Sequence, residues 1–121
     1  MYLDACSEVR VKDLKVSGTM SGNVKASITT TYVNGTSGYR IWSDGFIEQW
    51  GRTAALTDAT VTVTFSKAFS NTNYLLIGMA VNAGWRVNVY SSSHTATTAI
   101  LGAGAINGSG TGNISWYAAG Y

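Results

Sequence analysis

The feature that most constrains this chain is a two-residue alternation of apolar and polar side chains. It starts near Val24 and returns in later segments, most clearly where Val61, Val63 and Phe65 are separated by threonines. Successive side chains of a β-strand point to opposite faces of its sheet, so this period indicates strands with one buried face. No window of useful length has the 3.6-residue period of an amphipathic helix. The pattern therefore predicts an all-β fold.

Turn-forming residues separate the alternating segments. Asn34-Gly35, Asp44-Gly45 and the triplet at 82–84 are of this kind. Short strands at near-regular spacing, joined by such turns, favour an antiparallel β-sandwich. We therefore predict two antiparallel sheets packed face to face.

Two further segments carry specific predictions. The run 74–81 is apolar apart from one glycine, which predicts a strand buried on both faces. The stretch 102–112 has closely spaced glycines, but it lacks lysine and a strand pattern follows it. A phosphate-binding loop must open a helix, so this stretch does not fit one. We expect a long mobile loop between strands.

The turn at 44–45 predicts a pairing for the strands around it. A two-residue loop would place Trp42 opposite Ile47 and Tyr39 opposite Trp50. Bulky residues would then lie on both faces of the hairpin. One face can fill the subunit's own core while the other meets a neighbouring subunit. The alternative is a hairpin packed between two sheets of a single monomer.

The first part of the chain differs from the rest. Residues 1–22 hold three of the six acidic and three of the eight basic residues, and no tryptophan. We interpret them as an N-terminal connector to something upstream. Because 121 residues make one ordinary domain, we predict a single β-sandwich domain at 23–121.

The composition bears on assembly and on partners. Charged residues make up 12% of the chain, about half of the usual ~25%, while hydrophobic residues make up 45%. This favours a homo-oligomer whose interfaces cover apolar surface, and the alternative is a monomer coated by serine, threonine, asparagine and glycine. The net charge of +2 is spread along the chain, so we expect neither nucleic-acid binding nor membrane insertion.

Catalytic constellations are hard to assemble from this sequence. Asp44 and Glu48 are the only candidate acid pair, and the turn already accounts for Asp44. His94 is the single histidine, and no Gly-x-Ser-x-Gly motif accompanies it. Cys6 is the single thiol, so one chain cannot build a zinc site. We predict no enzyme activity, no cofactor and no metal; the alternative metal site is three His94 rings on the axis of a trimer.

Aromatic and amide side chains supply the candidate binding residues. Trp42, Trp50 and Trp116 lie in strand patterns and are interpreted as packing residues. Trp85 follows a loop, among groups that suit a glycan or a surface protein, although it could instead close the core at a strand end. The candidate receptor-binding residues are Asn82, Trp85, Arg86, Asn88, Tyr90, His94 and Asn107.

Three segments resemble one known family. Residues 38–51 read Gly-Tyr-Arg-Ile-Trp-Ser-Asp-Gly-Phe-Ile-Glu-Gln-Trp-Gly, 63–69 read Val-Thr-Phe-Ser-Lys-Ala-Phe, and 116–121 read Trp-Tyr-Ala-Ala-Gly-Tyr. These resemble the C-terminal domain of tail fibres of tailed phages and prophages. The family usually has proline where this chain has Ser66, which changes one loop entry. The likeness covers about residues 38–121, and its last six residues suggest a true C-terminus.

The resemblance implies a function and a place. It implies a homotrimeric β-sandwich at the distal end of a tail fibre of the virion, made in the cytoplasm of the bacterial host. Its partners would be upstream fibre or tail proteins and a bacterial surface glycan, such as lipopolysaccharide, or an outer-membrane protein. The family has no shared catalytic residues. The alternatives are a structural trimerisation cap that touches no receptor, and a polysaccharide depolymerase.

Overall fold

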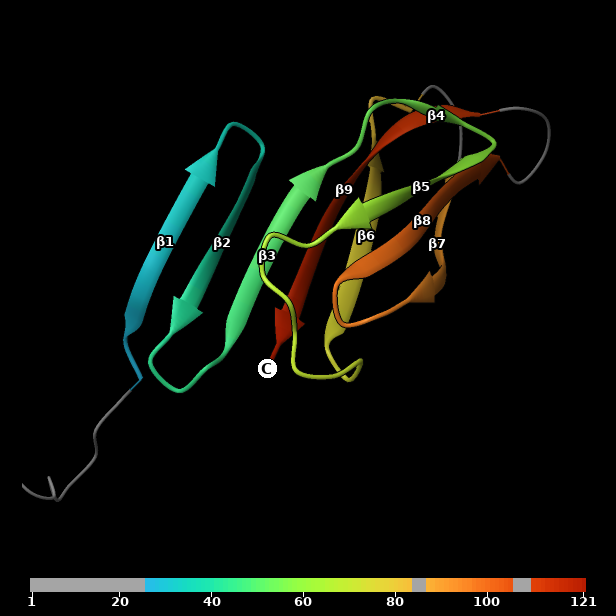
Figure 1. The fold of residues 1–121 in the computed structure, drawn as a ribbon. Helices are drawn as coiled ribbons and strands as arrows, with labels where there is room; N and C mark the ends of the chain where they lie inside the picture. Colours follow the sequence, from blue (N-terminus) through green and yellow to red (C-terminus); the bar gives the residue numbers. More distant parts are fainter. Residues whose placement is uncertain (1–25, 84–86, 106–109) are drawn as a thin grey trace, which may run out of the picture.

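The computed structural model describes residues 26–83, 87–105 and 110–121, and every regular element in these ranges is a β-strand (Figure 1). The predicted connector at 1–22 lies outside the described residues. The strands are β1 (Ile28–Asn34), β2 (Ser37–Trp42), β3 (Ile47–Arg52), β4 (Leu56–Thr57), β5 (Ala59–Thr64), β6 (Leu75–Val81), β7 (Val87–His94), β8 (Thr98–Ala105) and β9 (Thr111–Gly120).

The strands form two antiparallel sheets. In the large sheet the order is β1-β2-β3-β9, and both β4 and β6 pair with β9. In the small sheet β8 lies between β5 and β7. Figure 1 shows the small sheet in front of the part of the large sheet that contains β9 and β6, with β1 and β2 extending beyond it. The predicted all-β antiparallel fold is confirmed.

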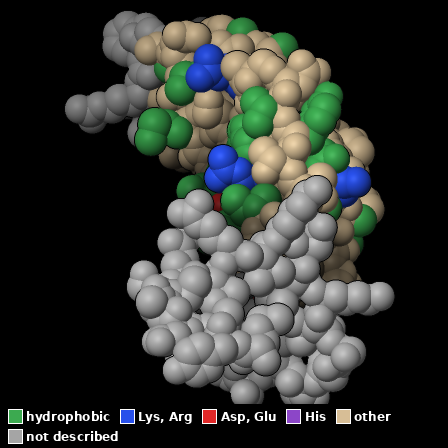
Figure 2. Space-filling model, turned by 90° about the vertical axis from the view of Figure 1, so that its left-hand side faces the viewer, with side chains coloured by type: hydrophobic (Ala, Val, Ile, Leu, Met, Phe, Trp, Pro, Cys, Tyr) green, Lys and Arg blue, Asp and Glu red, His purple; other side chains and the backbone are tan. Residues whose placement is uncertain are grey.

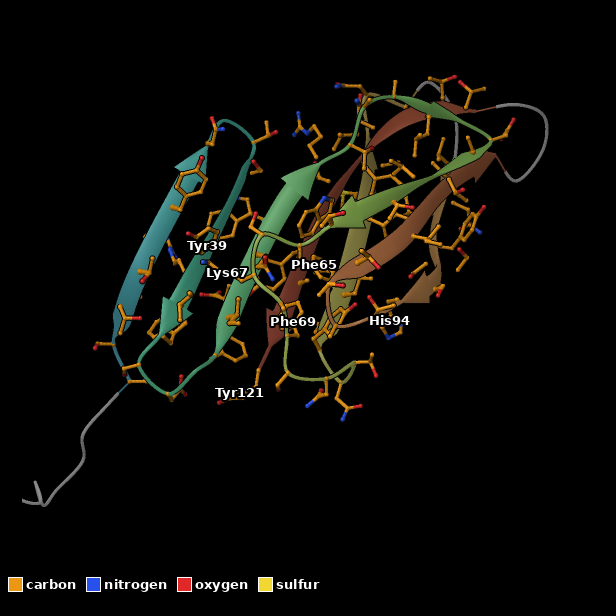
Figure 3. The ribbon with its side chains drawn as sticks, in the orientation of Figure 1. Tyr39, Phe65, Lys67, Phe69, His94 and Tyr121 are labelled. Carbon is orange, nitrogen blue, oxygen red and sulfur yellow. The ribbon has the colours of Figure 1, made fainter. Side chains whose placement is uncertain are left out.

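The core lies between the two sheets. The large sheet supplies Ile114 and Ala118, and the small sheet supplies Leu101, all of them buried. The alternation noticed in the sequence produces this arrangement, because the inner side chains of β9 and β8 are apolar. An aromatic cluster closes one end: Phe65 packs edge-on against Phe69 and Tyr74 (Figure 3). The two sheets therefore share one hydrophobic core.

The prediction for the run 74–81 is wrong in one respect. Residues 75–81 of this run form β6, but only one face of β6 packs against the core. Met79 is 70% exposed, Leu75 is 56% exposed and Ile77 is 54% exposed. A strand of this composition has an apolar outer face whether or not its own subunit covers that face, so one sequence cannot distinguish the two cases. Within a single subunit this face of β6 is open.

The strand β1 is an exposed edge. All seven of its residues are exposed, and among the described strands it pairs with β2 alone. The predicted alternation also breaks here, because a bulge lies between Ile28 and Thr30. Ile28 pairs with Trp42 and Tyr32 pairs with Tyr39, so Ile28 and Tyr32 lie on opposite faces rather than on the same face.

The predicted register of the β2–β3 hairpin is wrong by one residue. Tyr39 pairs with Gln49 rather than with Trp50. Because side chains alternate between faces, this shift moves every side chain of β3 to the other face relative to β2. Trp42 and Trp50 therefore share the outer face of the large sheet, while Gln49 points inward and is fully buried.

The cause of the shift is the loop. The N–H of Trp42 donates to the Phe46 carbonyl at 2.8 Å, and that of Gly45 donates to the Trp42 carbonyl at 2.9 Å, so three residues form the loop instead of two. Gly45 has φ +92°, while Asp44 has no positive φ and accepts a hydrogen bond from the Phe46 N–H at 3.0 Å. A turn followed by one glycine with positive φ is the usual three-residue hairpin.

Candidate functional site

On the outer face of the small sheet, two neighbouring rows of residues run across the strands, and each row contains one glycine of β8. Strand register places Tyr90 and Thr60 on either side of Gly102. In the next row Asn88 pairs with Gly104. A methyl group on Gly104 would lie 3.6 Å from the Asp58 Oδ1, so the Asp58 carboxylate belongs to this row as well. We call Asp58, Thr60, Asn88, Tyr90, Gly102 and Gly104 the glycine face.

The prediction that 102–112 is one long loop is wrong at its start. Residues 102–105 belong to β8, and β9 begins at Thr111. Residues 106–109, including Asn107, lie outside the described residues. Glycine suits β8 here because the Tyr90 ring covers Gly102 so closely that a Cβ at Gly102 would overlap it. The glycines thus let an aromatic ring lie against the sheet.

The Tyr90 ring is half covered and half open. One side of the ring rests on Gly102, and the residue is 46% exposed. Thr60, Asn88 and Asp58 are exposed around it and supply hydroxyl, amide and carboxylate groups. Asp58 is held in a left-handed backbone conformation, with φ 44°. The face therefore presents a flat apolar surface bordered by hydrogen-bonding groups.

The structure brings some of the predicted binding residues together and separates others. Asn88 and Tyr90 share the glycine face. Asn82 is exposed after β6 and also has a positive φ, 55°. Trp85 and Arg86 lie outside the described residues, so their assignment stays a prediction.

His94 does not join the glycine face. It ends β7, pairs with the buried Ala99, and packs its ring against Tyr74 with the centroids 5.4 Å apart (Figure 3). A bulge between Ser91 and Ser93 shifts the alternation just before it. His94 therefore belongs to the end of the molecule where the aromatic cluster lies.

Sequence reasoning missed Asp58 and Thr60. Both come from the β4–β5 region, about 30 residues before Tyr90 along the chain, so sequence proximity gave no reason to group them. The one usable signal was the alternation of 60–64, which places threonines on the outer face. Its pairing with β8 could not be read from the sequence.

On a second surface, the outer face of the large sheet, the carboxylate of Glu48 accepts hydrogen bonds from two neighbouring side chains. The Trp42 Nε1–H donates to the Glu48 Oε2 at 2.8 Å, and the Tyr117 hydroxyl donates to the Glu48 Oε1 at 2.7 Å. These two hydrogen bonds, the Trp42 bond first, outweigh partial burial and lower the pKa of Glu48, with a further contribution from the charge of Arg40. Burial and the neighbouring Glu48 raise the pKa of Tyr117.

This arrangement bears on the candidate acid pair. A general acid in glycoside hydrolysis needs a raised pKa so that it is protonated before it acts. Glu48 has the opposite shift, and both of its oxygens already accept hydrogen bonds. Asp44 is engaged in the hairpin loop and accepts from the Phe46 N–H. The geometry fits two structural carboxylates better than a catalytic pair.

Within 26–83, 87–105 and 110–121, no three histidine, cysteine or acidic side chains gather as a metal would require. Those same ranges contain no helix of the length and hydropathy needed to cross a bilayer.

The fold is an all-β domain with two sheets, whose outer faces carry the glycine face and the hydrogen-bonded Glu48. Residues 40–121 match the family described as "tail fiber protein gp53-like, C-terminal". Because this match covers more than half of the chain, the chain belongs to that family of tail-fibre C-terminal domains. No curated protein matches the chain.

Solved tail fibres share the fold. An N-truncated R2-type pyocin tail fiber is 25% identical, with a TM-score of 0.57, over 83% of this chain and 39% of that one. The R1 pyocin fiber of P. aeruginosa, residues 323–701, is 22% identical, with a TM-score of 0.55, over 81% of this chain and 28% of that one. An N-truncated R1-type pyocin tail fiber is 20% identical, with a TM-score of 0.54, over 81% of this chain and 87% of that one. The chain thus spans about two fifths of the first of these fibres.

Proposed function

We propose that this tail-fibre domain attaches its particle to the surface of a bacterial host, as a homotrimer, and that the glycine face binds a surface glycan. The observation that carries the proposal is the exposed Tyr90 ring lying flat on Gly102 between Thr60, Asn88 and Asp58. The tail-fibre family supports the attachment role. The choice of glycan comes from the chemistry of the face.

Sugars suit this face for two reasons. The apolar side of a pyranose ring stacks on an aromatic ring, and Tyr90 offers such a ring already fixed against the sheet. Sugar hydroxyls need donors and acceptors at the edges, which Asn88, Thr60 and Asp58 supply. Thr60, Asn88 and Tyr90 stand on strands rather than on a loop, so little of their conformational entropy is lost on binding. Asp58 lies in the bend between β4 and β5.

Three copies would make a weak site effective. A face of this size binds one or two sugar units, for which millimolar affinity is ordinary. Linking three such faces raises the overall affinity through effective concentration, provided that the glycans are dense enough for simultaneous binding. This is why the homotrimer belongs to the proposal.

Two details support a binding role over a catalytic one. The pKa of Glu48 is lowered rather than raised, and its oxygens are occupied. The glycine face has only Asp58 as an acid, whereas glycoside hydrolysis ordinarily needs two carboxylates. We therefore propose that the domain holds its glycan without cleaving it.

The experiment compares binding of the full chain to host cells with the binding of two variants. Tyr90→Ala removes the ring, and Gly102→Ala keeps it but lifts it off the sheet. We expect both to lose most cell binding while circular dichroism and solution mass stay unchanged. Thr72→Ala, on an exposed loop, is the control and should bind like the parent chain.

Treatment of the cells separates the receptor classes. Periodate, which oxidises vicinal diols of sugars, should abolish binding, and protease treatment should leave it intact. Loss with protease alone would replace the glycan by an outer-membrane protein. Normal binding of both Tyr90→Ala and Gly102→Ala would refute the assignment to this face. If the parent chain bound no cells on which its particle adsorbs, the trimerisation cap would be the better description.

A further inference from the structure

The large sheet has two free edges of equal length. β1 and β6 each contain seven residues, and each pairs with a strand on one side only. Four antiparallel steps separate them, β1-β2-β3-β9-β6, so β1 and β6 run in the same direction. Free edges with uncharged, apolar side chains are normally protected in a native protein. In the part of the chain that the structure describes, no further strand is hydrogen-bonded to either edge.

One row of side chains runs across the outer face from edge to edge. The registers place Val33, Gly38, Trp50, Tyr117 and Ile77 in line. The row is exposed at both ends, since Val33 is 59% and Ile77 is 54% accessible. An open apolar pocket of about 240 Å³ lies at the β6 end, lined by Ile77, Met79 and Tyr117 among others. Exposed apolar side chains therefore lie at both edges of the outer face, where another subunit could contact them.

Two charged side chains of this face, Glu48 and Arg52, already have hydrogen-bond partners within the subunit. Glu48 accepts from Trp42 and Tyr117. The Arg52 Nε–H donates to the Ser115 Oγ at 3.1 Å.

The remaining cation of the face, Arg40, also has a partner. Its guanidinium lies 5.8 Å from the centre of the Trp50 ring. Burial of a polar group is costly mainly when it loses its hydrogen bonds. A partner can therefore cover the face while Glu48 and Arg52 keep these hydrogen bonds and Arg40 stays close to the opposite charge of Glu48.

We propose that β1 of one subunit lies beside β6 of the next, so that three large sheets close into a triangular prism with their outer faces turned inward. The occupant of this face is a second copy of the chain. The proposal rests on the homotrimer named under the proposed function and specifies its interface. Rotation about an axis along the strands preserves strand direction, so the β1–β6 contact is parallel, as the topology requires.

The dimensions of such a prism fit the side chains. Five strands at a spacing of about 4.8 Å give each wall a width of about 20 Å, and the axis then lies about 6 Å from each wall. Packed sheets are about 10 Å apart, so each reaches about 5 Å to the plane between them. The interior therefore has the width that Trp50, Tyr117 and Ile77 would fill.

The arrangement also explains the shape of the subunit. The small sheets would lie outside the prism with their glycine faces open. The β1–β2 pair of each copy, which extends beyond the small sheet (Figure 1), would be covered at its free edge. Figure 2 looks onto the β1 side of one subunit, and the part of this side that is not grey shows hydrophobic side chains among tan surface, with only a few charged ones. Little charge on this visible part opposes the approach of another copy.

Chemical cross-linking tests the contact. In a Cys6→Ser background, Val33→Cys and Ile77→Cys are made singly and together, and the full chain is treated with a short bismaleimide. Within one subunit the two positions are four strand spacings apart, about 19 Å, which such a linker does not span. We expect the double variant to give covalent dimers and trimers on denaturing gels, with no larger species. Each single variant should give none.

Several outcomes would overturn the proposal. A trimer by light scattering whose double variant does not cross-link would refute the β1–β6 contact and leave the homotrimer intact. Self-linking of Ile77→Cys alone would place the β6 strands against one another instead. A ladder beyond the trimer would indicate an open chain of subunits. A monomeric mass would overturn both the prism and the homotrimer, whereas cell binding by the glycine face would still be tested by the Tyr90 variants.

Discussion

The backbone of Lys67 is bound at both its N–H and its carbonyl by one side chain, that of Gln49. The Gln49 Nε2–H donates to the Lys67 carbonyl at 2.6 Å, and the Lys67 N–H donates to the Gln49 Oε1 at 2.9 Å. Gln49 is fully buried. The side chain thus ties β3 to the segment that carries Phe65 and Phe69, while Lys67 itself reaches over the Tyr39 ring, 5.0 Å from its centre (Figure 3).

Replacing Gln49 should therefore destabilise the fold. Gln49→Leu keeps the volume but leaves the partly buried N–H and carbonyl of Lys67 without this partner, which costs about 2–4 kcal/mol in the free energy of unfolding. Urea unfolding followed by tryptophan fluorescence measures this loss in the free energy of unfolding. Thr62→Ala, at an exposed position of β5, is the control and should change stability by about 0.5 kcal/mol or less. Equal stability of Gln49→Leu and the control would contradict this role.

Gly51 should tolerate no side chain. A Cβ at this position would lie 2.7 Å from the Trp116 Cζ2, so the indole, which packs against the core, would have to move. We expect Gly51→Ala to cost about 1–3 kcal/mol through overpacking. Gly104→Ala is the matched control, because its Cβ meets Asp58 at an ordinary 3.6 Å. Thermal unfolding of the two variants should rank Gly51→Ala well below Gly104→Ala.

A substitution in the β2–β3 hairpin loop should lower the stability by less than Gly51→Ala does. Gly45 has φ +92°, a conformation that an L-residue adopts only with strain. Gly45→Ala should lower the free energy of unfolding by about 1–2 kcal/mol. Asp44→Asn, by contrast, keeps an oxygen for the Phe46 N–H and should cost less than Gly45→Ala. Chemical denaturation of both variants tests the order, and a reversal would mean that the loop relaxes readily.

The lowered pKa of Glu48 predicts a dependence of stability on pH. A carboxyl whose pKa is lower in the folded than in the unfolded chain stabilises the fold at pH values above its ordinary 4.5, and this contribution is lost as the pH falls through the lowered value. Unfolding measured between about pH 6 and pH 3 should therefore show a steeper loss for the parent chain than for Glu48→Gln.

Tyr117→Phe refines the test of Glu48. It removes one of the two donors to Glu48 while keeping the ring. The pKa of Glu48 should then move back toward its ordinary value, and the loss of stability with acid should lie between those of the parent chain and Glu48→Gln. Parallel pH curves for all three proteins would show that Glu48 is not the group responsible.

The fold class was predictable because alternation in strands such as β5 and β9 reflects which side chains face the core. The register of the β2–β3 hairpin was not predictable from Asp44-Gly45 alone, since the same pair serves two-residue and three-residue loops. The bulge after Ile28 likewise leaves no mark in the residue types. Local sequence determines strand identity here better than it determines pairing.

The binding face was predictable only in part. Asn88 and Tyr90 were identified because they stand close together in a segment rich in polar and aromatic residues. Asp58 and Thr60 join them through the pairing of β5 with β8, which is a long-range relationship. His94 was grouped with them by proximity along the chain, yet the bulge in β7 and its contact with Tyr74 place it elsewhere.

Alternate residues of β8 have different roles: those pointing inward form the core, and those pointing outward support the glycine face. Ala99, Leu101 and Ala103 point inward and are almost completely buried, whereas Gly102 and Gly104 lie beneath the side chains of the outer face. Mutations in those outer side chains can thus accumulate with little penalty to folding. A lineage carrying this domain could change its attachment chemistry repeatedly on an inherited framework, and libraries randomised at positions 60, 88 and 90 would sample the same freedom in the laboratory.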